Sequence, residues 1–172
     1  YKKIFKNTLN ENNSYEKRAE YVLNHNEGKL FQTPEMYYTF KETKNLEPFA
    51  IACLIDEKIT AVMLSVVQKE HSGIAGSFSA RSIIVGGPLF SDEASFKFLI
   101  KEFDIAMKGK VIFSQIRNMF PQDNKSEILK SAKYTFDEHL NILIDLTKGE
   151  KGLWSDVHPR GRTNINKGTK EG

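Results

Sequence analysis

Apolar and polar residues recur along the first part of the chain at spacings that predict two helices. Over residues 14–25, Ser14 can cap the first turn, and the apolar residues that follow recur at helical spacing. A second helix is predicted to begin at Thr33-Pro34, because threonine is a good N-cap and proline suits the first helical position. This second helix carries Met36, Tyr37, Phe40 and Lys41.

Extended apolar segments in the middle of the chain predict three strands. Residues 49–55 and 59–67 flank the polar turn Asp56-Glu57-Lys58, so we expect them to pair as an antiparallel hairpin. The Gly- and Ser-rich segment 71–79 is either a loop or a loosely paired edge. A third strand is predicted over 81–85, where Gly86-Gly87-Pro88 ends it.

The remaining apolar segments alternate between helix and strand. A helix is predicted over 92–107, a strand over 111–116 and a shorter helix over 124–132. The apolar centre of residues 135–146 predicts a last, buried strand. We expect both helices to pack on the sheet through Phe96, Leu99, Phe103, Ile128 and Leu129.

This order of elements resembles the acyltransferase fold shared by the GNAT superfamily. Two helices and a meander of three strands lead into strand and helix in alternation, which predicts a fold of the α/β (α+β) class. The sheet is expected to be central and mixed, with helices flanking it. So coarse an order of elements is also compatible with other folds.

Composition restricts the class of protein without fixing its function. A chain of 172 residues with 40% hydrophobic and 27% charged residues fits one globular domain. No run approaches the roughly 18 apolar residues of a membrane-spanning helix. Cys53 is the only cysteine, which excludes an internal disulfide and a cysteine-based zinc site. The net charge of +3 equals the excess of four basic residues over one acidic residue in segment 160–172.

The glycine pair after the third strand allows two interpretations. Its backbone N–H groups could face an anion, or the glycines could simply permit a tight turn that Pro88 ends. The Gln/Arg-x-x-Gly-x-Gly/Ala pattern of acetyl-CoA-binding GNAT proteins is absent, as are the Walker and dinucleotide motifs. The four histidines have no metal-site spacing, and no catalytic triad can be assigned. We therefore assign no catalytic residue and no cofactor to this chain.

Two groups of residues are candidates for anion binding. Lys41 lies near the face of its predicted helix that carries Tyr37 and Tyr38, where it is either a solvated charge or an anchor for phosphate or carboxylate. The tail after Pro159 is either a solvated amphipathic helix or a set of phosphate contacts, for which arginine is well suited. The tail's basic residues are Arg160, Arg162, Lys167 and Lys170.

Several of these segments together resemble the FemAB family of peptidoglycan bridge-forming aminoacyltransferases. The resemblance covers nearly the whole chain after Gly28, and its specificity lies in the order and spacing of motifs that are degenerate one by one. The matching segments are Phe31-Gln32-Thr33 with Lys41 downstream, the hairpin 49–67, Ile83-Ile84-Val85-Gly86-Gly87-Pro88-Leu89, the helix 92–107, Leu140-Asn141-Ile142-Leu143-Ile144-Asp145-Leu146, and Leu153-Trp154 followed by Arg162-x-Asn164-Ile165.

The resemblance implies the first half of a two-domain enzyme. Residues 1–158 would form a GNAT-like domain, and 159–172 would begin a basic interdomain helix. A second domain past Gly172 would carry the catalytic lysine and receive aminoacyl-tRNA, so the chain alone is expected to be inactive. Lys41 and Arg162 would bind the diphosphate of a peptidoglycan precursor, with Tyr37 or Tyr38 as an aromatic wall. The expected location is the cytoplasm, or the inner face of the membrane.

Two other functions are compatible with the sequence. The first is a GNAT-like acyltransferase of envelope polysaccharide synthesis with an acyl-CoA or carrier donor, which the missing CoA pattern disfavours. The second is a non-catalytic binding domain of the same fold. The sequence also departs from the FemAB pattern, because Gly161, Asn166 and Gly168 dilute the basic segment and each glycine costs about 1 kcal/mol of helix propensity against alanine. The acceptor could also be a sugar or peptide other than peptidoglycan.

Overall fold

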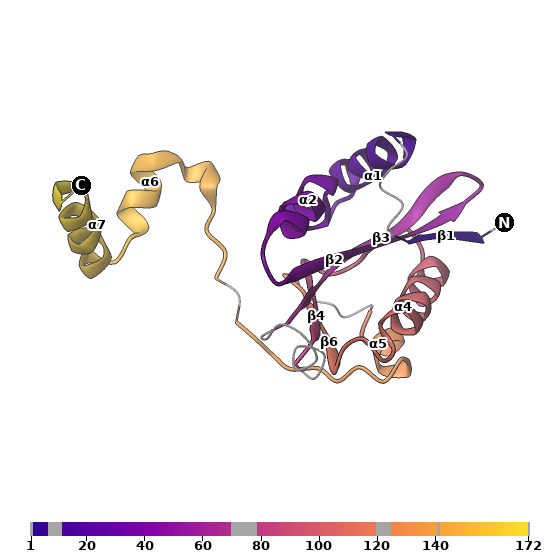
Figure 1. Cartoon of the computed structure of the whole chain (residues 1–172). Helices are drawn as coiled ribbons and strands as arrows, with labels where there is room; N and C mark the ends of the chain where they lie inside the picture. The colour runs from indigo at the N-terminus through magenta and orange to yellow at the C-terminus, as the bar shows by residue number, and fades with distance from the viewer. Residues whose placement is uncertain (1, 7–11, 70–78, 120–124, 141, 172) are drawn as a thin grey trace. The chain divides into compact units, whose positions relative to one another are not determined.

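The computed structural model of the chain separates into two compact units, residues 1–136 and 137–172. It describes residues 2–6, 12–69, 79–119, 125–140 and 142–171, and for residues 2–6 and 12–14 the backbone alone (Figure 1). Each unit is described by itself. Among the described residues, no helix combines the length and apolar character required to cross a membrane.

The N-terminal unit is built on a six-stranded mixed sheet. Its strand order is β1-β2-β3-β4-β6, and β5 pairs with β3 beside this path. All neighbours are antiparallel except β4 and β6, which run parallel. The strands are β1 (Lys2–Lys6), β2 (Leu46–Ile55), β3 (Lys58–Gln68), β4 (Arg81–Val85), β5 (Leu89–Phe90) and β6 (Phe113–Arg117). This confirms the predicted mixed sheet and the predicted hairpin, whose turn residues Asp56 and Glu57 have φ angles of 48° and 66°.

Helices cover both faces of the sheet (Figure 1). On one face lie α1 (Asn12–Asn24), the short 3₁₀ helix η1 (Leu30–Gln32) and α2 (Pro34–Glu42). On the other lie α4 (Glu93–Met107) and α5 (Ser126–Ser131). Alternate residues of β2 therefore enter different cores: Phe49 packs with α4, whereas Ala50 packs with α2. Burial on both faces explains the continuous apolar run of β2.

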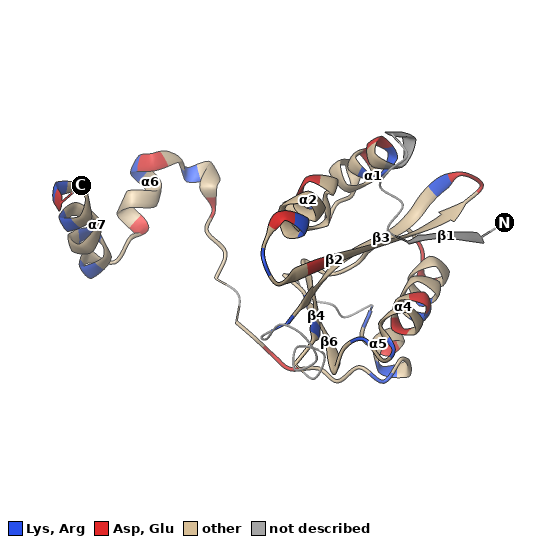
Figure 2. Ribbon diagram, in the orientation of Figure 1, with Lys and Arg blue, Asp and Glu red and all other residues tan. Residues whose placement is uncertain are grey.

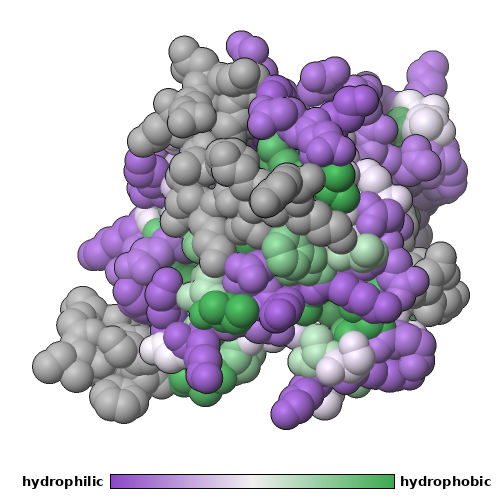
Figure 3. Space-filling view, turned by 90° about the vertical axis from the view of Figure 1, so that its right-hand side faces the viewer, coloured by the Kyte–Doolittle hydropathy of each residue, from purple (hydrophilic) through white to green (hydrophobic). Residues whose placement is uncertain are grey.

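The predicted core of α4 and α5 is confirmed. Asp92 caps α4, and Phe96, Leu99 and Phe103 are fully buried against the sheet and α5. Ile128 and Leu129 of α5 pack on the same cluster as Phe96. With these side chains inside, the described residues on the face seen in Figure 3 are mostly hydrophilic, with separate hydrophobic areas among them.

The first strand was not predicted, and the boundaries of later elements shift slightly. β1 is a lysine-containing edge strand that pairs with Ile51–Ile55 of β2, a partner that no local pattern reveals. The predicted strand 111–116 is observed as β6, and the predicted helix 124–132 as α5. The segment 71–79 lies, apart from Ser79, outside the described residues.

The prediction of a buried last strand over 135–146 is wrong. The described residues of this segment form no strand, and Leu140 and Ile142 are 100% and 91% exposed. Its apolar pattern suits a strand, but a strand needs a neighbour for its backbone hydrogen bonds, and no described strand pairs with it. The C-terminal unit continues with η2 (Leu146–Lys148), α6 (Gly149–Asp156) and α7 (Pro159–Glu171), and α7 confirms the predicted helix after Pro159.

Replacing Phe103 by alanine should lower the free energy of unfolding by about 3–5 kcal/mol, because a fully buried aromatic side chain leaves a cavity. Ile105→Ala is the matched control on the same helix, since Ile105 is 56% exposed and should cost less than about 1 kcal/mol. Urea denaturation of both variants measures the difference. Equal losses would contradict the packing of α4 described above.

Candidate functional site at the end of β4

The parallel strands β4 and β6 end side by side, and the chain turns sharply after β4. Val85 pairs with Arg117 in the last register position, and the Gly86 N–H then donates a hydrogen bond to the Arg117 carbonyl oxygen at 2.9 Å. Ligands of open sheets commonly bind outside the carboxyl ends of parallel strands. The turn after β4 is therefore the candidate site of this fold.

Both glycines of this turn are required by the backbone and by their neighbours. Gly86 and Gly87 have φ angles of 81° and 76°, in the region that glycine adopts without steric cost. A Cβ at Gly86 would lie 2.6 Å from Nε2 of Gln32, and one at Gly87 would lie 2.5 Å from Oδ1 of Asn118. The tight-turn interpretation therefore applies to Gly86, whose N–H is already used by Arg117 and is not free for an anion.

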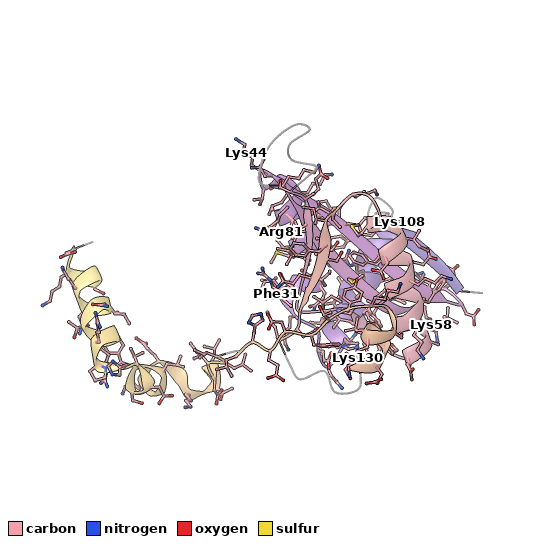
Figure 4. The ribbon with its side chains drawn as sticks, turned by 90° about the horizontal axis from the view of Figure 1, so that it is seen from below. Phe31, Lys44, Lys58, Arg81, Lys108 and Lys130 are labelled. Carbon is pink, nitrogen blue, oxygen red and sulfur yellow. The ribbon has the colours of Figure 1, made fainter. Side chains whose placement is uncertain are left out.

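Gln32 joins this turn to η1, which lies with α1 and α2 on one face of the sheet. Its side chain is fully buried, where Nε2 donates to the Gly87 carbonyl at 3.2 Å and Oε1 accepts from the Lys29 N–H at 3.0 Å. Its own carbonyl accepts from Nη2 of Arg18 at 2.9 Å. Phe31, the residue before Gln32, lies at the end of the sheet away from Lys58 and the hairpin turn (Figure 4).

In the sequence, Gln32 stands out only as part of the Phe31-Gln32-Thr33 motif, and no pattern singles out Arg18. The one available signal was a glutamine placed directly before the cap of α2, between an aromatic residue and Thr33-Pro34. The partner of Gln32 lies 55 residues away, so the sequence alone does not indicate it.

The N-terminus of α4 is closed by acidic groups. A carboxylate oxygen of Asp92 accepts from the Ser95 N–H at 2.8 Å, and its other oxygen accepts from the Ser95 hydroxyl at 2.7 Å. Glu93 adds a second negative charge in the first turn. A helix N-terminus attracts anions, but here a carboxylate already occupies that position and would repel a phosphate.

The candidate anion anchors of α2 lie together on one helix. Thr33 caps α2 as predicted, with its hydroxyl oxygen accepting from the Met36 N–H at 3.3 Å. The rings of Tyr37 and Tyr38 meet edge to face at 5.6 Å, with Tyr37 partly buried against the sheet and Tyr38 exposed. Lys41 follows one turn after Tyr37 and is exposed, and no described carboxylate pairs with it.

Arg162 lies in the C-terminal unit, on α7. Its Nε donates to the Val157 carbonyl at 2.9 Å, and the side chain is half-buried. Basic residues recur along α7 (Figure 2). Lys41 and Arg162 belong to different units, so the expected meeting of these two side chains stays a prediction. No group of described His, Cys, Asp and Glu side chains is arranged to hold a metal ion.

Comparison with known sequences gives no family. No protein-family model matches the chain, and no curated protein matches it.

Solved structures nevertheless share its fold. An aminoglycoside acetyltransferase from an uncultured soil metagenomic sample, solved with sisomicin, superposes with a TM-score of 0.57 at 17% identity, over 84% of this chain and 95% of that one. Glucosamine-6-phosphate N-acetyltransferase from Arabidopsis thaliana gives 0.55 at 12% identity, over 84% and 99%. A transcriptional regulator from Bacillus halodurans C-125 gives 0.56 at 13% identity, over 84% and 100%. The chain therefore has the GNAT acyltransferase fold, with an α+β mixed sheet flanked by helices.

The close approach of Gln32 leads to a prediction at Gly86. Gly86→Ala should lower the free energy of unfolding by about 2–4 kcal/mol, because it adds a left-handed backbone penalty to the loss of a buried hydrogen bond. Gly109→Ala is the control, since Gly109 has a φ angle of 73° but nothing within 4 Å of a Cβ. That variant should lose only about 1 kcal/mol, the backbone penalty. Chemical denaturation compares the two, and equal losses would show that Gln32 does not constrain the turn.

Proposed function

We propose that the chain is the first domain of a FemAB-like aminoacyltransferase, which adds an amino acid from aminoacyl-tRNA to the peptide of a peptidoglycan precursor. The observation that carries the proposal is the acidic N-terminus of α4. This helix follows β4, the third strand of the meander. CoA-binding proteins of the fold carry their glycine-containing pattern between the corresponding strand and helix. Here Asp92 and Glu93 replace a phosphate cradle with negative charge. A donor other than acyl-CoA fits this arrangement.

The acceptor side of the proposal rests on α2 and α7. Lys41 presents an exposed ammonium group beyond Tyr37 and Tyr38, and these rings offer an aromatic wall. Arg162 has guanidinium N–H groups besides the Nε that donates to the carbonyl of Val157, the residue that ends α6. Two cations of this kind, with Lys41 as a point charge and Arg162 as a planar fork, suit a diphosphate.

The fold likeness favours a second candidate, an acyltransferase of envelope polysaccharide synthesis that uses an acyl-CoA or carrier donor. Two of the structures with this fold are acetyltransferases named for an aminoglycoside and for glucosamine-6-phosphate. A transfer to an amino group of a sugar would be the corresponding activity here. A non-catalytic binding domain of the same fold remains the third candidate, and it would bind the acceptor without transferring anything.

Arg162→Ala should weaken binding of a nucleotide-linked muropeptide by about 1.5–3 kcal/mol, the usual size of a charge-assisted hydrogen bond. Its effect on stability should be about 1 kcal/mol, the net value of one hydrogen bond, because the half-buried side chain loses the bond from Nε to the Val157 carbonyl. Isothermal calorimetry on the chain measures the affinity, with Lys170→Ala on the same helix as the matched loss of one charge. Equal affinities for wild type and Arg162→Ala would remove the basis for the site.

The donor is tested in the same experiment. Acetyl-CoA added to the wild-type chain should give no binding heat, because carboxylates occupy the start of α4. Tight, stoichiometric binding of acetyl-CoA would contradict the proposal that aminoacyl-tRNA is the donor. It would favour the second candidate, an acyltransferase that uses acyl-CoA.

A further inference from the structure

Arg18 is a charged side chain buried in the N-terminal unit with one buried hydrogen-bond donor unpaired. It projects from α1 and is only 4% exposed. Its Nη2 donates to the Gln32 carbonyl, while its Nε is buried without a hydrogen-bond partner. A guanidinium carries five N–H donors, and leaving a buried donor unpaired is costly. The arrangement therefore lacks an acceptor.

The charge of Arg18 also has no ion-pair partner among the described residues. Burial lowers the pKa of Arg18 to about 10, so the side chain is still protonated at neutral pH. No described carboxylate forms an ion pair with it, and Glu35 and Tyr37 act on it only through the electrostatic field. Buried charges in proteins are normally paired, because an isolated one loses its hydration without replacement.

The carboxylate that acts on Arg18, Glu35, is hydrogen-bonded to a tyrosine. The Tyr15 hydroxyl donates to Oε1 of Glu35 at 2.6 Å, and this hydrogen bond is the main reason that the pKa of Glu35 is lowered. Tyr15 lies one turn before Arg18 on α1, so both side chains occupy the same helix face. The Tyr38 ring lies 6.4 Å from the Tyr15 ring. Phenol hydroxyls and a guanidinium together are a donor set for an oxyanion.

We propose that the junction of α1, η1 and α2 binds an oxyanion, the phosphate or carboxylate group of a ligand, on Arg18 and Tyr15, and that Glu35 holds this place until the ligand arrives. In this proposal the ligand oxygen replaces the Glu35 carboxylate as acceptor of the Tyr15 hydroxyl and accepts from the unpaired Nε of Arg18. Glu35 is exposed and moves to solvent. This site goes beyond the proposed function, which uses neither Arg18 nor Tyr15.

The hydrogen bonds of Gln32 connect this site to the end of β4. The same residue that accepts from Arg18 through its carbonyl also donates to the Gly87 carbonyl through its side chain. An oxyanion on Arg18 therefore stabilises the arrangement of η1 that holds the turn after β4. A ligand with one anionic group at this junction would be anchored on the same network as the candidate site.

Thermal unfolding with inorganic pyrophosphate as the probe tests the site, with sodium chloride adjusted to keep the ionic strength constant. The melting temperature of the wild-type chain should rise by about 4 °C or more at saturating pyrophosphate. Arg18→Met, which keeps the length of the side chain and removes the charge, should show no rise. Lys17→Met is the matched control, because Lys17 is the neighbouring, more exposed cation of α1 and its variant should keep the full rise.

A second anion and a second variant extend this experiment. The anion tests which chemical group binds, and the variant tests the site at an exposed position where a folding defect is not expected. Succinate in place of pyrophosphate decides whether a carboxylate or a phosphate is preferred. Glu35→Gln removes the competing charge at an exposed position, so pyrophosphate should bind at least about threefold more tightly by calorimetry. No rise in the wild type with either anion, an equal rise in Arg18→Met, or unchanged affinity in Glu35→Gln would overturn the proposal.

Discussion

Burial of the β2–β3 hairpin on both faces is the constraint on which the rest of the N-terminal unit depends. Because successive side chains of a strand point to opposite faces, an uninterrupted apolar strand must be covered twice. Phe49 needs α4, and Ala50 needs α2, so neither helix layer can be absent while the hairpin stays folded. Both helix layers thus converge on one pair of strands. Because β4 pairs directly with β3, the position of the hairpin also sets the position of the end of β4.

A buried polar network then connects the layer of α1 and α2 with the turn after β4. Apolar packing fixes how far the layers lie apart, but it does not specify the conformation of a turn with two residues at positive φ. The Gln32 side chain supplies that specificity through hydrogen bonds to Gly87 and Lys29. The amide of a buried glutamine needs hydrogen-bond partners for both its nitrogen and its oxygen, because a buried polar group without a partner lowers stability. Gly86 accordingly has no room for a side chain.

Charge is unevenly distributed over the described helices of this chain. Asp92 and Glu93 make the start of α4 negative, whereas α7 is rich in lysine and arginine (Figure 2). A shared fold says little about the reaction, because the fold supports many chemistries and the site decides among them. The function proposed above therefore rests on where these charges lie, and the solved structures contribute the fold.

The sequence by itself determined the elements whose signals are local. The Thr33-Pro34 start of α2, the start of α4 at Asp92 and the turn of the hairpin each depend on residues a few positions apart, and the sequence predicts all three. Tertiary structure alone decided the rest. β1 exists because the edge of β2 accepts it, and the described residues of the apolar segment 140–146 form no strand because no described strand pairs with them. The unpaired guanidinium of Arg18 and the contact of Gln32 with Gly87 have the same origin: burial and hydrogen bonding between distant segments are set by packing in three dimensions, which spacing along a chain does not encode.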